Sequence, residues 1–330
     1  MIITRTPMRL SFTGGGSDLP AYYRQFTGKV VSTSIDKYIY ITVNKLTEYF
    51  DCKYMLKYSK TEMCDSIKDI QHPIIREVLL YLDIDDRLEI TSMADLPAGT
   101  GLGSSSSFTV GLINALFAYK NRYESKDTIA DTACELEINI LNEPIGKQDQ
   151  YAASFGGLRV ISFLPDETVT TDNVICSLST KNHLSNNLML FYTGMTRNAS
   201  GVLLEQKKLT KDDNRVQEAI SYMVDQCDSL LSVISNGPTL TEIGYILHRG
   251  WMRKKSLVMS ISNLEIDDYY QKALSAGAIG GKLCGAGNGG CLLFYVEPQN
   301  QDKVRQVLSD LREVKFNFDN EGTKVIYFSE

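Results

Sequence analysis

Hydrophobic and polar residues follow two periods along the chain, and each period predicts a different element. Residues 30–46 are β-branched and aromatic and alternate with polar residues, which is typical of a long strand. Residues 1–13, 88–90 and 158–163 show the same strand-like pattern, as do the more apolar runs at 188–192 and 291–296. The pattern predicts that strands supply much of the core.

A period of three to four residues predicts helices between these strands. Phe108, Leu112, Ala115, Leu116 and Tyr119 make one apolar stripe, typical of a helix that faces a core. Similar stripes predict helices over residues 72–82, 126–142, 214–235 and 240–257. The helices and strands of the C-terminal half indicate a mixed α+β arrangement, and we expect the chain to belong to the α+β fold class.

Residues 165–187 are polar and show neither period, so they predict a boundary in this 330-residue chain. We therefore expect an N-terminal domain over residues 1–184 and a C-terminal domain over residues 185–330. Two strand-like segments near the end, 315–318 and 324–328, are assigned to the C-terminal half.

Composition excludes several classes of protein. The net charge of −6 argues against a general nucleic-acid surface, and no apolar run approaches the ~18 residues of a membrane span. Seven scattered cysteines without a CxxC pair indicate free thiols in a reducing compartment, and the three histidines lie too far apart for a usual zinc site. We expect a cytoplasmic protein that binds neither membranes nor nucleic acid.

A glycine- and serine-rich stretch, residues 96–108, lies between a predicted strand and a predicted helix. Glycines let the backbone approach a ligand closely, and the following helix N-terminus offers free N–H groups and a positive dipole end. Together these features favour an anion site, most often one for phosphate. A helix cap explains one of the four consecutive serines but not all of them.

Two further glycine clusters, residues 13–18 and 282–290, lie far from the first in the sequence. The last formally fits G-x-G-x-x-G, but a strand follows it where a dinucleotide-binding motif needs a helix. The chain also lacks the P-loop motif G-x-x-x-x-G-K-[ST] and the H-R-D and D-F-G motifs of protein kinases. A phosphate cradle made of backbone amides is the interpretation that remains.

Three carboxylates are candidates for chemistry. Glu137 falls in the apolar arc of its predicted helix, so it either holds a metal ion or pairs with an internal cation. Asp149 follows a Gly/Pro turn and is a modest candidate for a base. Asp18 is either a functional carboxylate that the first glycine turn holds in place or a plain turn residue. A basic run on the helix 240–257 favours a solvated face.

The three glycine-rich motifs, taken in their order along the chain, resemble those of the GHMP kinase superfamily. Leu96-Pro-Ala-Gly-Thr-Gly-Leu-Gly-Ser-Ser-Ser is similar to its ATP loop, P-x-x-x-G-L-G-S-S. Thr6-Pro-Met-Arg-Leu with Gly14-Gly-Gly-Ser-Asp resembles its N-terminal motif, and Lys282-Leu-Cys-Gly-Ala-Gly-Asn-Gly-Gly its C-terminal one. The resemblance covers essentially the whole chain. It implies a ribosomal protein S5 domain 2-like N-terminal domain, a ferredoxin-like C-terminal domain, and ATP with Mg²⁺ as cofactors.

The resemblance also implies roles for individual residues. The nucleotide would bind at Pro97, Gly99, Gly101, Leu102, Gly103, Ser104, Ser105 and Ser106, and the metal at Ser105 and Glu137, with Ser104 as the near alternative to Ser105. Asp149 would deprotonate or orient the attacking hydroxyl, and Arg9 would favour its ionised form. The substrate would contact Gly15, Gly16, Ser17, Asp18, Asp149, Arg197, Gly285, Ala286 and Gly287.

One departure bears on the substrate. Galactokinases carry Gly-Glu-His in the first motif, whereas this chain has Gly14-Gly-Gly16. Together with Gly-Lys-Gln-Asp-Gln and Trp251-x-x-Lys-Lys, this form looks like the branch that contains heptose 7-phosphate kinases, with the kinase half of L-fucokinase as a near relative. The implied substrate carries a phosphate, for which Arg197 is the first candidate cation, followed by Lys29, Lys254 and Lys255.

Overall fold

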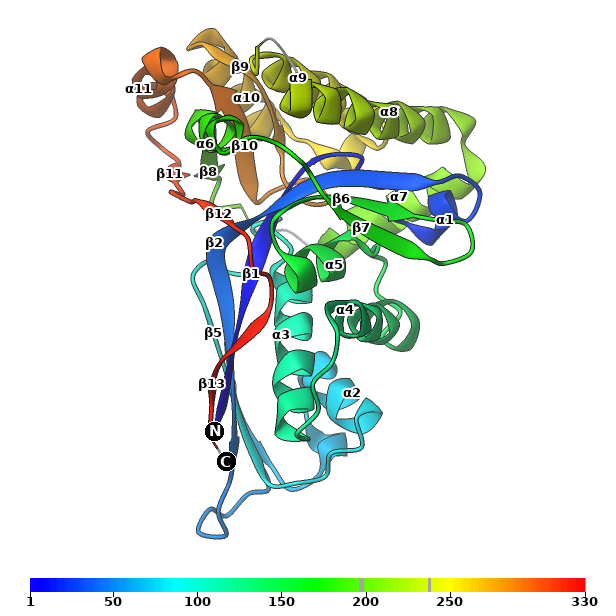
Figure 1. Ribbon diagram of the computed structural model, residues 1–330, viewed down its shortest axis with the longest axis vertical. Coiled ribbons are helices and arrows are strands. Elements are labelled where there is room, and N and C mark those ends of the chain that lie inside the picture. The colour runs from blue at the N-terminus through cyan, green and yellow to red at the C-terminus, as the bar shows by residue number, and fades with distance from the viewer. Residues whose placement is uncertain (196–198, 237–238, 330) are drawn as a thin grey trace.

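A large, strongly bent sheet forms the first half of the molecule in the computed structural model, which describes residues 1–195, 199–236 and 239–329 (Figure 1). Its main path runs β13-β1-β2-β5-β3-β4, while β12 and β6 pair with β2, and β7 pairs with β6. Only β3 and β5 pair in parallel among the described strands. The strands are β1 (Ile2–Thr13), β2 (Gly28–Lys45), β3 (Tyr54–Lys57), β4 (Thr61–Cys64), β5 (Leu88–Ala94), β6 (Leu158–Phe163), β7 (Val169–Asn173), β12 (Phe318–Asp319) and β13 (Lys324–Phe328).

Helices cover one face of this sheet (Figure 1). They are α2 (Pro73–Tyr81), α3 (Ser104–Tyr119), α4 (Lys126–Cys134) and α5 (Gln148–Phe155), and the π-helical segment η2 (Glu135–Ile140) continues α4. The helix α3 is buried on almost every side, beyond its predicted stripe. At Gly111 a Cβ atom would lie 2.8 Å from Thr6 Oγ1, so glycine is what lets α3 lie directly on β1.

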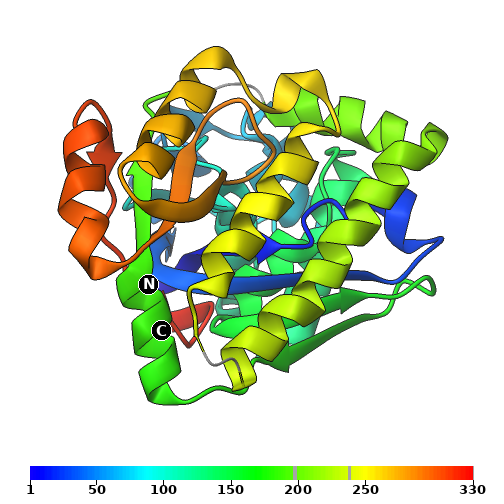
Figure 2. The same cartoon turned by 90° about the horizontal axis from the view of Figure 1, so that it is seen from above.

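A four-stranded antiparallel sheet with the order β11-β8-β10-β9 forms the second half. Its strands are β8 (Leu188–Tyr192), β9 (Ala278–Leu283), β10 (Cys291–Val296) and β11 (Arg312–Glu313). The helices of this half are α7 (Ala199–Asp212), α8 (Asn214–Asn236), α9 (Glu242–Lys255), α10 (Leu264–Ser275) and α11 (Pro298–Val307). Figure 2 shows α8 and α9 side by side, and the two helices are in contact.

The end of the chain returns to the first sheet, where β13 pairs with β1 and β12 pairs with β2. The assignment of residues 315–318 and 324–328 to the C-terminal half is therefore wrong for the paired residues. Met1 donates its terminal N–H to the Ser329 carbonyl at 2.7 Å, so the described ends lie side by side. A strand pattern reports that a segment is extended, but not which sheet edge it will join. The boundary after residue 184 stays a prediction.

Most predicted elements are present, but only Phe318 of the strand predicted over residues 315–318 lies in a strand, β12. The polar stretch 165–187 contains β7 and the helix α6 (Leu178–Asn187), which begins with Ser177 as a capping residue that accepts from the Thr180 N–H. The short elements α1 (Pro20–Tyr23), η1 (Ile67–Asp69) and η3 (Met259–Ile261) complete the described chain. Among the helices described, none is long and apolar enough to cross a membrane.

Candidate active site

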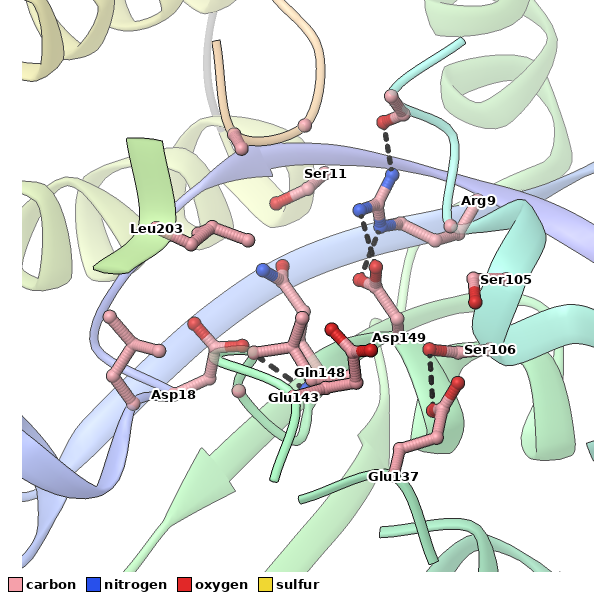
Figure 3. Close-up of a pocket in the computed structure, with 18 of the residues that line it drawn as sticks. Arg9, Ser11, Asp18, Ser105, Ser106, Glu137, Glu143, Gln148, Asp149 and Leu203 are labelled. Atoms are coloured by element: carbon pink, nitrogen blue, oxygen red, sulfur yellow. Dashed lines mark hydrogen bonds and ion pairs between the residues drawn. The ribbon is translucent and has the colours of Figure 1, made fainter. Parts of the chain in front are cut away.

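The three glycine-rich segments meet around one pocket with a volume of about 470 Å³ (Figure 3). The first segment contributes Gly15, Gly16 and Asp18 to the lining, and the third contributes Gly285 and Ala286. The second contributes Gly99, Gly101, Gly103 and the serines 104–106. Figure 3 shows Asp149 between a group formed by Ser105, Ser106 and Glu137 and a second group that contains Ser11, Asp18 and Leu203. The pocket therefore brings together segments from both halves of the chain.

The second segment is built to present backbone N–H groups. Gly99, Gly101 and Gly103 all have positive φ, and Gly103 caps α3 in the left-handed conformation at φ 75°. The N–H groups in the first turn of a helix have no partner within the helix. Ser104 to Ser106 form that turn and line the pocket, so the anion site predicted from the sequence lies at the pocket wall.

Two of the predicted nucleotide-binding residues do not line the pocket. Leu102 is fully buried, and its carbonyl accepts the backbone N–H of Arg9 at 2.9 Å. Pro97 is exposed outside the lining. Leu102 therefore supports the loop from behind, whereas Gly99, Gly101, Gly103 and the serines line the cavity.

Glu137 is buried to 1% exposure at the edge of the pocket, as its place in the apolar arc predicts. Its carboxylate accepts from Ser106 Oγ at 2.9 Å, Thr109 Oγ1 at 2.8 Å and Gln150 Nε2 at 2.6 Å. Burial raises the pKa of Glu137 to about 7, against the three hydrogen bonds, which lower it. No cation of the described residues pairs with Glu137, so the internal salt bridge is wrong for that part of the chain.

The surroundings of Glu137 fit a hard cation such as Mg²⁺, which prefers carboxylate and hydroxyl oxygens. A buried carboxylate held only by neutral donors keeps an uncompensated charge at the pocket wall. Ser106 is the serine that bonds to Glu137, whereas Ser105 is exposed. The assignment of Ser105 and Glu137 as metal ligands therefore stays a prediction, with Ser106 as a further hydroxyl beside the carboxylate. The described chain holds no cluster of three His, Cys, Asp or Glu residues around a metal position.

Asp149 and Arg9 form the central ion pair of the pocket. Arg9 Nε donates to Asp149 Oδ1 at 2.7 Å, and a second guanidinium nitrogen donates to Oδ2 at 2.8 Å. A third nitrogen donates to the Gly101 carbonyl at 2.7 Å. The Asp149 side chain is 24% exposed while that of Arg9 is 4% exposed, so the carboxylate is fixed in orientation but open to the cavity. A bidentate arginine is suited to holding a reactive carboxylate.

Asp18 lies at the other side of Asp149, buried against the first glycine loop. It accepts from the backbone N–H groups of Gly16 at 3.0 Å and Gln148 at 3.3 Å. Burial, and then the nearby charge of Asp149, raise the pKa of Asp18. A Cβ at Gly146 would lie 2.0 Å from Asp18 Oδ2, which explains the glycine there.

Ser17 does not face the pocket, contrary to its predicted role. It is fully buried, its hydroxyl donates to the Lys29 carbonyl, and the Lys29 N–H donates back to it. It fixes the glycine turn rather than contacting a ligand. Gly287 is also outside the lining, because it packs against Ile261.

The third glycine segment joins two antiparallel strands, β9 and β10, as a hairpin loop. This confirms that its G-x-G-x-x-G pattern is not a dinucleotide-binding turn. A Cβ at Gly101 would lie 2.5 Å from the Cys284 carbonyl oxygen, and one at Gly285 would lie 2.6 Å from Gly101 Cα. Glycine on both sides lets the second and third segments touch.

The candidate cations differ sharply in their surroundings. Lys29 pairs with Asp228 at 2.7 Å and Lys255 pairs with Asp267 at 2.6 Å. Lys254 lines the pocket with 8% exposure, so the solvated-face prediction for the basic run is wrong at this position. Arg197 lies outside the described residues.

Several lining residues were not found from the sequence. Lys282, 7% exposed, donates to the carbonyls of Ser11 at 2.7 Å and Phe12 at 3.1 Å. Three residues that line the pocket have a buried side-chain polar atom without a partner among the described residues, namely Ser11 Oγ, Gln148 Oε1 and Gln206 Nε2. Ser11, Gln148 and Lys282 adjoin recognised motifs, which was the available signal. Gln206 and Leu203 lie on α7, and no motif marks them.

The pocket, with a glycine-rich helix N-terminus, an Arg-held aspartate and a buried glutamate, defines a phosphotransferase site. The family model for the GHMP kinases N terminal domain matches residues 72–157, and that for the GHMP kinases C terminal matches residues 234–314. The chain belongs to the GHMP kinase family, and its expected α+β fold is confirmed. It is a phosphotransferase with an alcohol group as acceptor.

Individual members of the family are similar to this chain over nearly its full length. The chain is 30% identical to D-glycero-alpha-D-manno-heptose 7-phosphate kinase of Campylobacter jejuni over 98% of both chains. It is 25% identical to L-fucokinase/L-fucose-1-P guanylyltransferase of Bacteroides fragilis, over 93% of this chain and 36% of that one. The solved structure of a D-glycero-D-manno-heptose 1-phosphate kinase from Bacteroides thetaiotaomicron covers 100% of both chains with a TM-score of 0.81 and 22% identity.

Proposed function

We propose that this protein transfers the γ-phosphoryl group of ATP to the anomeric hydroxyl of D-glycero-D-manno-heptose 7-phosphate. The products are heptose 1,7-bisphosphate and ADP, and the reaction serves the synthesis of GDP-heptose for surface polysaccharide in the cytoplasm. The 30% identity to a heptose 7-phosphate kinase over nearly the full length supports the substrate. The observation that carries the reaction type is the carboxylate of Asp149, fixed by Arg9 and open to the cavity.

Asp149 accepts a hydrogen bond from the hydroxyl group that will be phosphorylated. An incoming hydroxyl donates its proton toward the carboxylate, the hydroxyl oxygen bonds to the γ-phosphorus, and the bond from phosphorus to the bridging oxygen of ADP breaks. Arg9 holds both carboxylate oxygens, so Asp149 cannot rotate away from the acceptor. Positioning of this kind supplies much of the rate of phosphoryl transfer.

The phosphates of ATP would lie along the N–H groups of Gly101 to Ser106 at the start of α3. Glu137, with Ser106 or Ser105, would hold Mg²⁺. When bound, the ion neutralises charge on the phosphate oxygens. Thr109 and Gln150 keep the Glu137 carboxylate oriented toward the pocket wall by donating to it.

Asp18 and the first glycine loop would contact the sugar on the opposite side of Asp149. A glutamate in place of Gly15 or Gly16 would fill this space, which favours a larger acceptor than galactose. The expected phosphate ligand, Arg197, remains a proposal. Arg197→Ala should raise the KM for heptose 7-phosphate at least tenfold because a charged hydrogen-bond pair is lost, and an unchanged KM would remove Arg197 from this role.

The test of the function is an ADP-release assay with ATP, Mg²⁺ and a panel of acceptors. The panel contains heptose 7-phosphate, L-fucose, galactose, mannose and mevalonate. We expect the highest kcat/KM with heptose 7-phosphate. The alternative is L-fucose or another unphosphorylated sugar, which the similarity to the L-fucokinase of Bacteroides fragilis supports, and a higher kcat/KM for fucose would establish it.

A further inference from the structure

Lys254 is a buried ammonium group in the pocket that lacks a carboxylate partner. Its Nζ donates to the Gly285 carbonyl, and no ion pair joins it to an acidic residue within the described ranges. The next residue on α9, Lys255, pairs with Asp267 at 2.6 Å and does not line the pocket. A buried charge held only by a carbonyl is costly, so the pocket around Lys254 is suited to an anion.

A continuous set of contacts links Lys254 to the reacting groups. Gly285, which accepts from Lys254, packs directly on Gly101 of the phosphate loop. Gly101 in turn accepts from Arg9, and Arg9 holds both oxygens of Asp149. The ammonium therefore lies where the third glycine segment meets the phosphate loop, on the C-terminal side of the pocket.

Lys282 differs from Lys254 although it is equally buried in the same pocket. Its Nζ donates to two carbonyls of β1, those of Ser11 at 2.7 Å and Phe12 at 3.1 Å. These bonds tie β9 to β1 across the two halves. One carbonyl satisfies one of the three Lys254 donors, which leaves two for a ligand. Lys282 is thus a structural support whose charge adds to that of Lys254.

The phosphoryl group that is transferred carries negative charge that the site must neutralise. In phosphoryl transfer, charge is spread over three equatorial oxygens of the phosphorus, and fixed cations around it stabilise the transition state. Figure 3 shows Ser105 and Ser106, at the start of α3, and Glu137 on one side of Asp149. Arg9 is already matched with Asp149, so it is not free to neutralise the phosphoryl oxygens.

Resting on the proposed kinase activity, we propose that Lys254 is a catalytic residue that donates hydrogen bonds to the phosphoryl group during its transfer. Lys254 keeps its proton throughout. The bond from phosphorus to the ADP oxygen breaks, the bond to the acceptor oxygen forms, and the acceptor proton goes to Asp149. The competing assignment, in which Lys254 binds a phosphate that the acceptor already carries, is an outcome of the test.

The experiment compares Lys254→Met and Lys254→Gln with the control Lys255→Met. For each, kcat and KM are measured with ATP on heptose 7-phosphate and on the same heptose without phosphate, and the ATP Kd is measured at equilibrium. Gln keeps a donor for the Gly285 carbonyl without the charge, and thermal unfolding checks that each variant is folded. The wild type is assayed first, so a failure of the proposed function shows as activity on another acceptor. The Lys254 variants are then compared with the wild type on that acceptor.

We expect both Lys254 variants to lose on the order of 10²-fold in kcat on either acceptor, with the ATP Kd within threefold and Lys255→Met near wild type. Three results would overturn the proposal. In the first, kcat is kept and only the KM for the phosphorylated acceptor rises. In the second, the ATP Kd weakens while kcat at saturation is kept. In the third, the Lys254 variants and Lys255→Met behave alike.

Discussion

Replacing Glu137 with glutamine tests whether its carboxylate is buried without a compensating cation. Burial raises the pKa of Glu137 to about 7 from the ordinary value of 4.5. At about 1.36 kcal/mol for each pH unit, this difference corresponds to about 3.4 kcal/mol. The native state binds a proton more tightly than the unfolded state, so this stabilisation is complete below pH 4.5 and is lost as the pH rises through 7.

Glutamine does not titrate, so Glu137→Gln removes this pH dependence. Relative to wild type, the free energy of unfolding of Glu137→Gln should increase by about 3 kcal/mol between pH 4 and pH 8. The amide fits the site because Gln150 Oε1 is buried without a partner among the described residues and can accept from it after an amide flip. The absolute difference at pH 4 includes any misfit of the amide, whereas the change with pH does not.

The assay is urea unfolding at pH 4, 6 and 8, in EDTA so that no divalent cation binds the native state. Thr128→Ser, at a half-buried position of α4 that does not titrate and keeps its hydroxyl, is the control and should differ from wild type by the same amount at all three pH values. A difference between Glu137→Gln and wild type that does not change with pH would refute the reasoning, since it would mean that the pKa of Glu137 is not raised in the native state.

Three further predictions address the pocket. Asp149→Asn should lower kcat by at least about 10²-fold with the ATP Kd unchanged, and a near-normal kcat in steady-state assays would remove Asp149 from the reaction. Gly103→Ala should lower the free energy of unfolding by about 1–2 kcal/mol because φ is 75°. It should also lower kcat, because its Cβ would lie 3.3 Å from Asp149 Oδ2. Gly201→Ala, with open space around it, is the control in the denaturant and activity assays. Burial lowers the pKa of Lys254 to about 8, so kcat/KM, which reports the free enzyme, should fall above pH 8 as the ammonium loses its proton. A kcat/KM profile that stays flat up to pH 10 would contradict its charged role.

The sequence predicts the parts of the site that obey local rules. The helical period placed Glu137 inward, and the structure confirms its burial. The glycine pattern of the second segment predicted a loop that opens a helix, and α3 begins at Ser104. Arg9 and Asp149 were brought together by resemblance alone, because no local pattern relates positions 140 residues apart.

The remaining features depend on register and on tertiary contacts. Ser105 and Ser106 are chemically identical, and only the path of α3 decides that Ser106 bonds to Glu137. Lys254 and Lys255 look alike in the sequence, but a rotation of about 100° around α9 separates them, so one enters the pocket and the other pairs with Asp267. A run of charges is therefore a poor guide to which of its members is buried.

The return of β12 and β13 to the first sheet follows from pairing across the whole chain. The strand predicted over residues 324–328 is confirmed as β13, and Ile2 and Ile3 at the other end of the chain are among its partners. Of the strand predicted over residues 315–318, only Phe318 lies in β12, where it pairs with Ile35 of β2. Gln206 and Leu203 enter the pocket only because α7 packs beside the first glycine segment, where a Cβ at Gly16 would lie 2.4 Å from Gln206 Nε2. Contacts of this kind have no signature in a single sequence.

The position of the new phosphate is the most direct test of the central claim. The wild-type protein is incubated with ATP, Mg²⁺ and heptose 7-phosphate, and the product is examined by ³¹P NMR. We predict one new phosphate signal coupled to the anomeric proton, formed in equal amount to ADP. A new phosphate at any other carbon, or ADP formed without phosphorylation of the sugar, would contradict the assignment of this protein as a heptose 7-phosphate 1-kinase.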